Sequence, residues 1–251
     1  MQDKEQHLVE HLGELRKRII IVAASFILFF ILGFVYVKDI YKWFVRDLDV
    51  KLTVLGPSDI IWVYMSLAGV IAVAATIPIF ALQLWLFVRP ALTVKERRVT
   101  LNYIPALFIL FILGLSFGYF IIFPIVFKFL LELSGDMVVT IFTASNYFTF
   151  ILHMTIPFGI LFELPVVVMF LTSLGIINPF VLSKIRKYAY FVLIIVAITI
   201  TPPEVTSDIL VSIPLLLLYE LSISLSKIVY KRRLKKQAEN EVLSADEGPI
   251  L

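Results

Sequence analysis

The hydrophobic positions of the chain fall into long runs, without the alternation of apolar and polar residues that is typical of strands. The runs occupy residues 19–37, 60–88, 99–127, 147–173, 188–200 and 209–227. A helix needs about 20 apolar residues to cross a hydrocarbon core of about 30 Å. The pattern therefore predicts six transmembrane helices. At about 1.5 Å per residue the run 188–200 reaches only about 20 Å, so we expect local thinning of the bilayer or a water-accessible dent there.

The polar and proline positions set the ends of these predicted helices. Leu8, Leu12, Leu15 and Ile19 recur at helical spacing, which predicts an amphipathic helix along the membrane surface before the first span. Asn178-Pro179 predicts a turn. Interior prolines favour kinks, because each removes a backbone hydrogen bond. They are Pro78, Pro105, Pro124, Pro157, Pro165 and Pro214.

Composition supports this picture and excludes a soluble domain. The 251 residues are 60% hydrophobic and only 16% charged, with a mean hydropathy of +0.97. We expect one all-α membrane domain over residues 1–230 and a charged tail without regular structure over 231–251. The absence of cysteine excludes disulfides, thiolate nucleophiles and cysteine-based metal sites.

The distribution of lysine and arginine predicts the orientation. Most of the 22 basic residues lie at the N-terminus, in the loop after the second span, in the loop after the fourth, and after the sixth. By the positive-inside rule these segments and both termini are cytoplasmic.

Charged side chains inside the runs are candidate functional residues. Glu163 lies near the middle of the fourth run, where a carboxylate costs about 2.5 to 3.5 kcal/mol, so it should face a protein interior, a cavity or a partner. It is either functional or a protonated side chain that is hydrogen-bonded to a neighbouring helix. Glu220 is either functional or paired with Lys227. For His153 we expect a hydrogen-bonded core histidine.

Two glutamates stand among the basic residues of the predicted cytoplasmic face. Glu14 lies beside Arg16, and Glu96 lies beside Arg97. A carboxylate can accept a bidentate pair of hydrogen bonds from a guanidinium, so the two glutamates together could hold two arginines of a ligand. The alternative is that they neutralise the adjacent basic side chains on a solvated face.

Enzymatic and transporter functions are weaker interpretations. His7 to His11 match H-x-x-E-H, a zinc-peptidase pattern, but too little chain precedes them to enclose a metal. No phosphate-binding loop of the G-x-x-x-x-G-K-[ST] type occurs, and we expect no enzyme activity, cofactor or metal. A proton-coupled secondary transporter that uses Glu163, Glu220 and His153 is the alternative function, although the repeated halves typical of such transporters are missing.

Four short motifs together resemble the TatC family of the twin-arginine protein translocase. They are HLGELR at 11–16, PAL with KERR within 90–98, FELP at 162–165 and TPP at 201–203. They occur in the family's order and on the predicted sides of six spans, and the resemblance extends from about residue 7 to about residue 230. After TPP the chain departs from the family pattern, because it has Glu204, Ser207 and Asp208 where the family usually has Asp and then Ser-Gln.

The resemblance implies a receptor in the bacterial cytoplasmic membrane that has six helices and a glove-like concave shape. Such a receptor binds folded cargo through a signal peptide with paired arginines, assembles into a multimer with the single-span subunits TatB and TatA, and uses the proton-motive force. No nucleic-acid partner is implied. Carried over to this chain, Glu14 and Glu96 would bind the arginines, with Arg16 and Arg97 shaping the site. Glu163 and Pro165 would contact a partner helix. Further candidate residues are His11, Glu204, Asp208 and Glu220.

Overall fold

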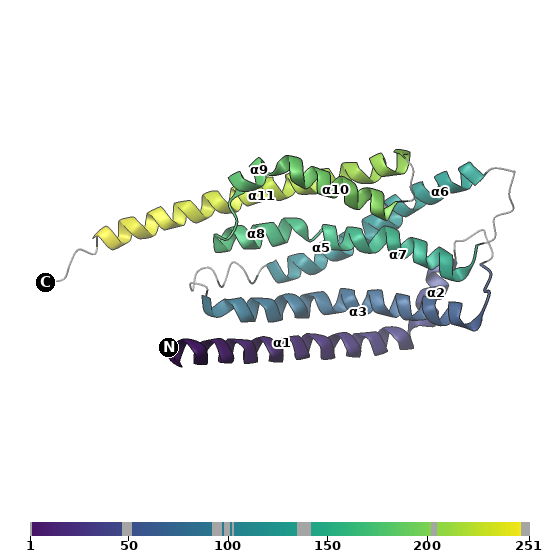
Figure 1. Cartoon of the computed structure of the whole chain (residues 1–251), viewed down its shortest axis with the longest axis horizontal. Coiled ribbons are helices and arrows are strands. Elements are labelled where there is room, and N and C mark those ends of the chain that lie inside the picture. Colours follow the sequence, from purple (N-terminus) through teal and green to yellow (C-terminus); the bar gives the residue numbers. More distant parts are fainter. Residues whose placement is uncertain are drawn as a thin grey trace. The chain divides into compact units, whose positions relative to one another are not determined.

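The computed structural model describes residues 2–46, 52–91, 97, 101, 103–134, 142–201 and 205–246, and their side chains within 13–46, 52–90, 97, 101, 103–132, 142–201 and 207–235. These residues are almost entirely helical (Figure 1). The chain divides into two compact units, which are described separately. One is Met1–Thr93 with Ile104–Ile160, and the other is Val94–Tyr103 with Leu161–Leu251.

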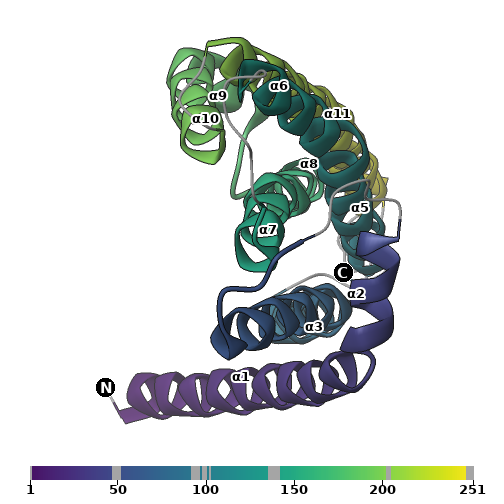
Figure 2. The same ribbon diagram turned by 90° about the vertical axis from the view of Figure 1, so that its right-hand side faces the viewer.

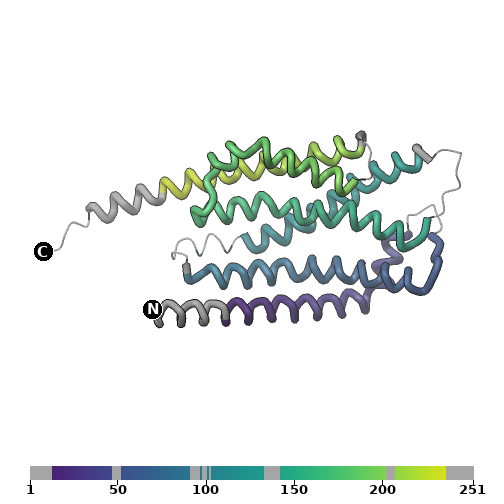
Figure 3. The backbone as a smooth tube through the Cα atoms, viewed as in Figure 1, coloured from purple at the N-terminus to yellow at the C-terminus, as the bar shows by residue number. Residues whose placement is uncertain are grey.

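In the first unit, α1 (Gln2–Val35) and α3 (Pro57–Val88) lie antiparallel and side by side, joined through the short helix α2 (Val37–Val45) (Figures 1, 2 and 3). Pro57 occupies the first turn of α3, where its missing N–H costs nothing. The prediction of a separate surface helix before the first span is wrong. α1 runs unbroken from Gln2, because Gly13 is tolerated inside a helix and no proline interrupts it.

The rest of the first unit consists of a helix with a π-helical segment and the helix α7. α5 (Tyr103–Phe117) continues through η2 (Gly118–Ile122), a π-helix, into α6 (Phe123–Ser134). α7 (Ala144–Leu161) packs on it so closely that a Cβ on Gly114 would lie 2.5 Å from the Phe158 carbonyl oxygen. Small residues permit such backbone contact between membrane helices.

The second unit is built around α11. It contains α8 (Leu164–Leu174), α9 (Pro179–Lys184), α10 (Arg186–Ile200) and α11 (Val205–Asp246), and α8, α9 and α10 all contact α11. Buried Thr172 and Ser226 share a hydrogen bond of 2.7 Å between α8 and α11. Gly175, at φ 77°, ends α8 in the left-handed conformation that glycine adopts freely. The predicted turn at Asn178-Pro179 is confirmed, since Asn178 caps α9.

Among the described residues, five helical segments are long and apolar enough to cross a membrane. They are Gly13–Val35, Pro57–Val88, Tyr103–Glu132, Ala144–Leu174 and Ser207–Lys235. The fifth predicted span, residues 188–200, is not among these five; it corresponds to α10, which has only 15 residues and reaches about 22 Å. The expectation that residues from 231 lack regular structure is wrong as far as Asp246, because α11 continues to that residue. Lysine, arginine, glutamate and alanine in this segment are good helix formers.

Candidate functional site

Glu14 and its neighbours form the part of the predicted arginine site that the structure describes. Arg18, one turn further along α1, forms an ion pair with Glu14 and donates a hydrogen bond to Gln83 Oε1 of α3 at 3.3 Å. The Glu14 side chain is 36% exposed and that of Arg18 only 17%. The Glu14 carboxylate therefore already binds a guanidinium and remains accessible to solvent or a ligand.

The other residues of the predicted cytoplasmic site are only partly described. Arg16 is exposed on α1, and Arg97 is half-buried. Glu96 and Glu204 lie outside the described residues, and of His11 only the backbone, within α1, is described. The H-x-x-E-H pattern falls in the same segment of α1. Among the side chains that the structure does describe, no group of three or more histidine, aspartate or glutamate residues could hold a metal ion.

Glu163 lies at the break between α7 and α8. Residues 162 and 163 form a turn, and Pro165 in the first turn of α8 begins the new helix without needing a hydrogen-bond acceptor for its nitrogen. Both carboxyl oxygens of Glu163 are buried, and neither has a hydrogen-bond partner in the described part of the chain. The hydrogen bond to a neighbouring helix that we considered as an alternative is therefore not formed there. A buried polar group without a partner is costly, so this position is suited to a polar group from another molecule.

Glu220 belongs to a polar cluster between α10 and α11. Arg186 Nε lies 2.9 Å from Glu220 Oε1, and the hydroxyl of Tyr190 donates a hydrogen bond to the same oxygen. The Arg186 contact is an ion pair without hydrogen-bond geometry at Nε. The alternative pairing with Lys227 is wrong, because α10 packs against this face of α11 and brings Arg186 closer. Arg186 and Tyr190 lie four residues apart on one helix face, which was the available sequence signal.

Asp208 holds the start of α11 to the end of α10. The Thr201 hydroxyl lies 2.5 Å from Asp208 Oδ1 and 2.9 Å from the carbonyl oxygen of Ala197. Thr201 is buried and Asp208 is half-buried. The contact joins the residue that follows α10 to the first turn of α11, which gives Asp208 a structural role.

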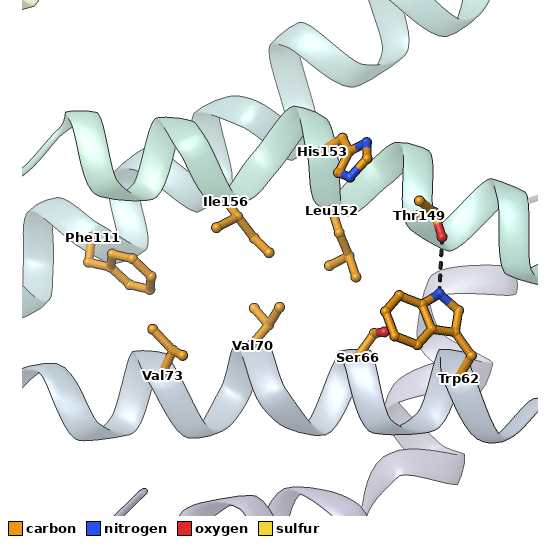
Figure 4. A pocket seen from close by; sticks show the side chains of 9 residues that line it. All are labelled: Trp62, Ser66, Val70, Val73, Phe111, Thr149, Leu152, His153 and Ile156. Carbon is orange, nitrogen blue, oxygen red and sulfur yellow. Dashed lines mark hydrogen bonds between the residues drawn. The ribbon is translucent and has the colours of Figure 1, made fainter. Parts of the chain in front are cut away.

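A small apolar pocket of about 290 Å³ lies between α3 and α7 within the first unit (Figure 4). Leu152 and Ile156 of α7 point toward Val70 and Val73 of α3, and Trp62 Nε1 donates a hydrogen bond to Thr149 Oγ1 at 3.1 Å. The hydrogen bond joins α3 to α7 at one end of the pocket.

His153 is exposed at the rim of this pocket, so the expectation of a buried core histidine is wrong. The buried positions of α7 include Ile151, Met154 and Phe158, and His153 falls on a different face of the helix. α7 is apolar nearly all round, so its hydrophobic pattern did not indicate which face is buried.

Comparison with known proteins gives consistent results over nearly the whole chain. Residues 10–214 match the family model described as "Sec-independent protein translocase protein (TatC)". The chain is 59% identical over 237 residues to Sec-independent protein translocase protein TatCd of Bacillus subtilis (strain 168), covering 94% of this chain and 98% of that protein. It is 45% identical to TatCy of the same organism, covering 98% of each. A crystal structure of the twin-arginine translocase receptor TatC matches with a TM-score of 0.75 at 32% identity, covering 87% of this chain and 99% of that one.

Proposed function

Because the chain belongs to the TatC family of Sec-independent protein translocase proteins, we propose that it is the receptor subunit that binds twin-arginine signal peptides of folded cargo proteins. The observation that carries this proposal is the Glu14 carboxylate, which is 36% exposed and already binds a guanidinium, that of Arg18. An arginine of a signal peptide would present the same chemical group to the same acceptor. A planar guanidinium can form two parallel hydrogen bonds with a carboxylate, which a lysine ammonium cannot do.

The second arginine of the peptide would bind Glu96, which precedes Arg97 in the first cytoplasmic loop. Arg16 and Arg97 would shape the site by repelling peptides that insert in the wrong register, since like charges brought together are unfavourable. His11 lies three residues before Glu14, one turn earlier on α1, and would contact the peptide beside its arginines. We further propose six spans, with α10 as the shortest and both termini cytoplasmic. By the positive-inside rule all of these residues would then lie on the side from which cargo approaches.

A second proposed contact is with a partner helix at Glu163. Its buried carboxyl oxygens have no hydrogen-bond partner in the described part of the chain. Pro165 lies in the first turn of α8 and has no backbone N–H to donate at the helix break. A polar side chain from the single transmembrane helix of TatB or TatA would complete the missing hydrogen bonds. Several copies of the chain would assemble with these subunits into a multimeric receptor in the bacterial cytoplasmic membrane. The proton-motive force would drive the export of cargo.

The remaining candidates have supporting roles in this proposal. Asp208 and Glu204 would shape the turn between α10 and α11, and Glu220 would hold α10 on α11 through Arg186. The transporter interpretation needs Glu220 as a proton carrier, but this carboxylate is held between Arg186 and Tyr190 in a contact that joins α10 to α11.

The test is binding of a fluorescent twin-arginine signal peptide to the detergent-purified chain, compared with the same peptide carrying two lysines. We expect the arginine peptide to bind at least about tenfold more tightly, because each lysine loses the bidentate geometry. Glu14→Gln should remove most of this preference. Glu132→Gln is the matched control, because it makes the same change on an exposed side chain of α6. Equal binding of the two peptides to the unmodified chain would contradict the proposal.

A further inference from the structure

An apolar groove of about 670 Å³ runs along the contact between α1 and α3, apart from the pocket beside α7. Its walls include Val22 and Phe26 of α1 and Phe80 and Leu84 of α3. The polar residues in its lining are Arg18, Thr76 and Gln83. Thr76 donates its hydroxyl to Ala72 O of its own helix at 2.6 Å, so it offers no hydrogen to a ligand. The groove therefore suits a hydrocarbon chain along most of its length.

The length of the groove matches one leaflet of a bilayer. On α1 it extends from Leu15 to Ile27, which is a rise of about 18 Å at about 1.5 Å per residue. One leaflet contributes about 15 Å of hydrocarbon, half of a core of about 30 Å. A transmembrane partner helix would need a surface that crosses both leaflets, so it fits this groove less well than an acyl chain does.

The charge of the groove is concentrated at one end. Arg18 and Gln83 are hydrogen-bonded to each other there, and Arg18 Nε is buried without a hydrogen-bond partner in the described part of the chain. A guanidinium has five N–H donors, so its contacts with Glu14 and Gln83 leave donors available. Near the same end of α3, the guanidinium of Arg89 stacks 5.5 Å from the ring of Trp85. Arginine and tryptophan together are typical of the headgroup level of a membrane.

The helix that forms one wall of the groove, α1, is covered by the rest of the described chain over only a small part of its surface. Only 6% of the most apolar 18-residue window within Gly13–Val35 is buried. α1 is held against α3 and touches α2 at its end. Acyl chains are therefore the material that surrounds this helix, and a chain that entered the groove would remain in contact with both helices.

We propose that this groove binds one anionic phospholipid of the cytoplasmic leaflet. One acyl chain lies between α1 and α3, and the phosphate accepts hydrogen bonds from the Arg18 guanidinium. Hydrogen bonds between a guanidinium and a phosphate are charge-assisted and stronger than neutral ones. The bound lipid also fills the space beside the contact that holds α1, so it should stabilise the first unit by mass action.

The first experiment measures retention of lipid by the detergent-purified full chain in native mass spectrometry. Phosphatidylglycerol and phosphatidylcholine with identical acyl chains are compared, with glycerol phosphate as the probe of the headgroup alone. We expect phosphatidylglycerol to be retained in preference to the other two. Arg18→Gln should weaken its binding about tenfold, as expected for the loss of a charge-assisted hydrogen bond. Lys17→Gln removes the same charge from an exposed neighbour and should have little effect.

The second experiment tests the acyl chain. Ala23 lines the groove, whereas the adjacent Ala24, which is also exposed, is not among the residues that line it. Ala23→Trp should fill the groove and reduce phosphatidylglycerol retention, and Ala24→Trp should leave it unchanged. Equal retention by both tryptophan variants, or by Arg18→Gln and Lys17→Gln, would overturn the proposal. Loss of signal-peptide binding in Ala23→Trp without loss of lipid would also overturn it, because the peptide would then be the occupant. The proposal does not depend on the peptide-binding role of Glu14.

Discussion

Glu14 and Arg18 lie one turn apart on α1 and form an ion pair at the polar end of the α1–α3 groove. The pair places the proposed acceptor for a ligand's arginine in contact with an arginine of the same chain. An arginine of a ligand therefore competes with Arg18 for the Glu14 carboxylate. The free energy of breaking the internal ion pair reduces the free energy of ligand binding. Because Glu14 is 36% exposed, solvent screens this pair and its strength is modest.

The first prediction is that Arg18→Gln raises the affinity for a twin-arginine peptide. Exposed ion pairs contribute about 0.2 to 1 kcal/mol, so we expect affinity to rise by up to about fivefold. The measurement is the peptide titration described above, with Lys17→Gln as the control for the loss of one positive charge. An increase of the same size in both variants would mean that net charge, and not competition for Glu14, causes the change.

Glu163 and Glu220 give a second prediction, because one glutamate has no partner in the described part of the chain and the other has two. Glu163→Leu removes a buried polar group that makes no hydrogen bond there. It should stabilise the isolated chain by about 1 to 3 kcal/mol. Glu220→Leu leaves Arg186 and Tyr190 without their shared acceptor, so it should destabilise the chain. Thermal unfolding in detergent measures both.

The same two variants separate stability from function. Glu163→Leu should abolish co-purification with a single-span partner, even though the chain is more stable. If Glu163→Leu lowers the melting temperature as much as Glu220→Leu does, then Glu163 is already satisfied within the isolated chain, and the proposed partner site fails.

The positions of five of the six predicted spans agree with long apolar helices of the described chain, whereas the faces on which the helices pack could not be predicted. Membrane spans are set by the length of apolar runs, and the runs beginning at 60 and 147 correspond to α3 and to α7 with α8. Packing faces depend on which neighbouring helix approaches. Helices that are apolar all round carry little amphipathic signal, so the exposure of His153 could not be predicted. The spacing of Arg186 and Tyr190 was visible, but it did not indicate that their helix packs against Glu220.

For the candidate site too, the features of single residues could be predicted, whereas the contacts between residues could not. The burial of Glu163 was predicted correctly because the cost of an exposed carboxylate in hydrocarbon does not depend on neighbours. The competition of Arg18 for Glu14 was missed, although the spacing of four residues on one helix was visible in the sequence. The groove needs two helices to form it, and no pattern within either helix indicates its presence.

The third prediction concerns Gly114 and Gly118, a G-x-x-x-G pair that allows α5 and η2 to touch α7. A Cβ on Gly114 would lie 2.5 Å from Phe158 O, and one on Gly118 would lie 2.8 Å from Thr155 Cα. These neighbours are backbone atoms, which cannot move aside as a flexible side chain can. Gly114→Ala should therefore force the helices apart and cost about 1 to 3 kcal/mol, the usual range for overpacking.

Gly13→Ala is the matched control for this prediction. A Cβ on Gly13 would meet nothing within 4 Å, and Gly13 lies inside helix α1. Alanine is the better helix former there by about 0.5 to 1 kcal/mol, so this variant should unfold at a higher temperature than the unmodified chain. Opposite shifts from the same chemical change would show that backbone contact, and not helix propensity, decides the result at Gly114. Stabilisation by both substitutions would mean that α5 and α7 do not touch at Gly114.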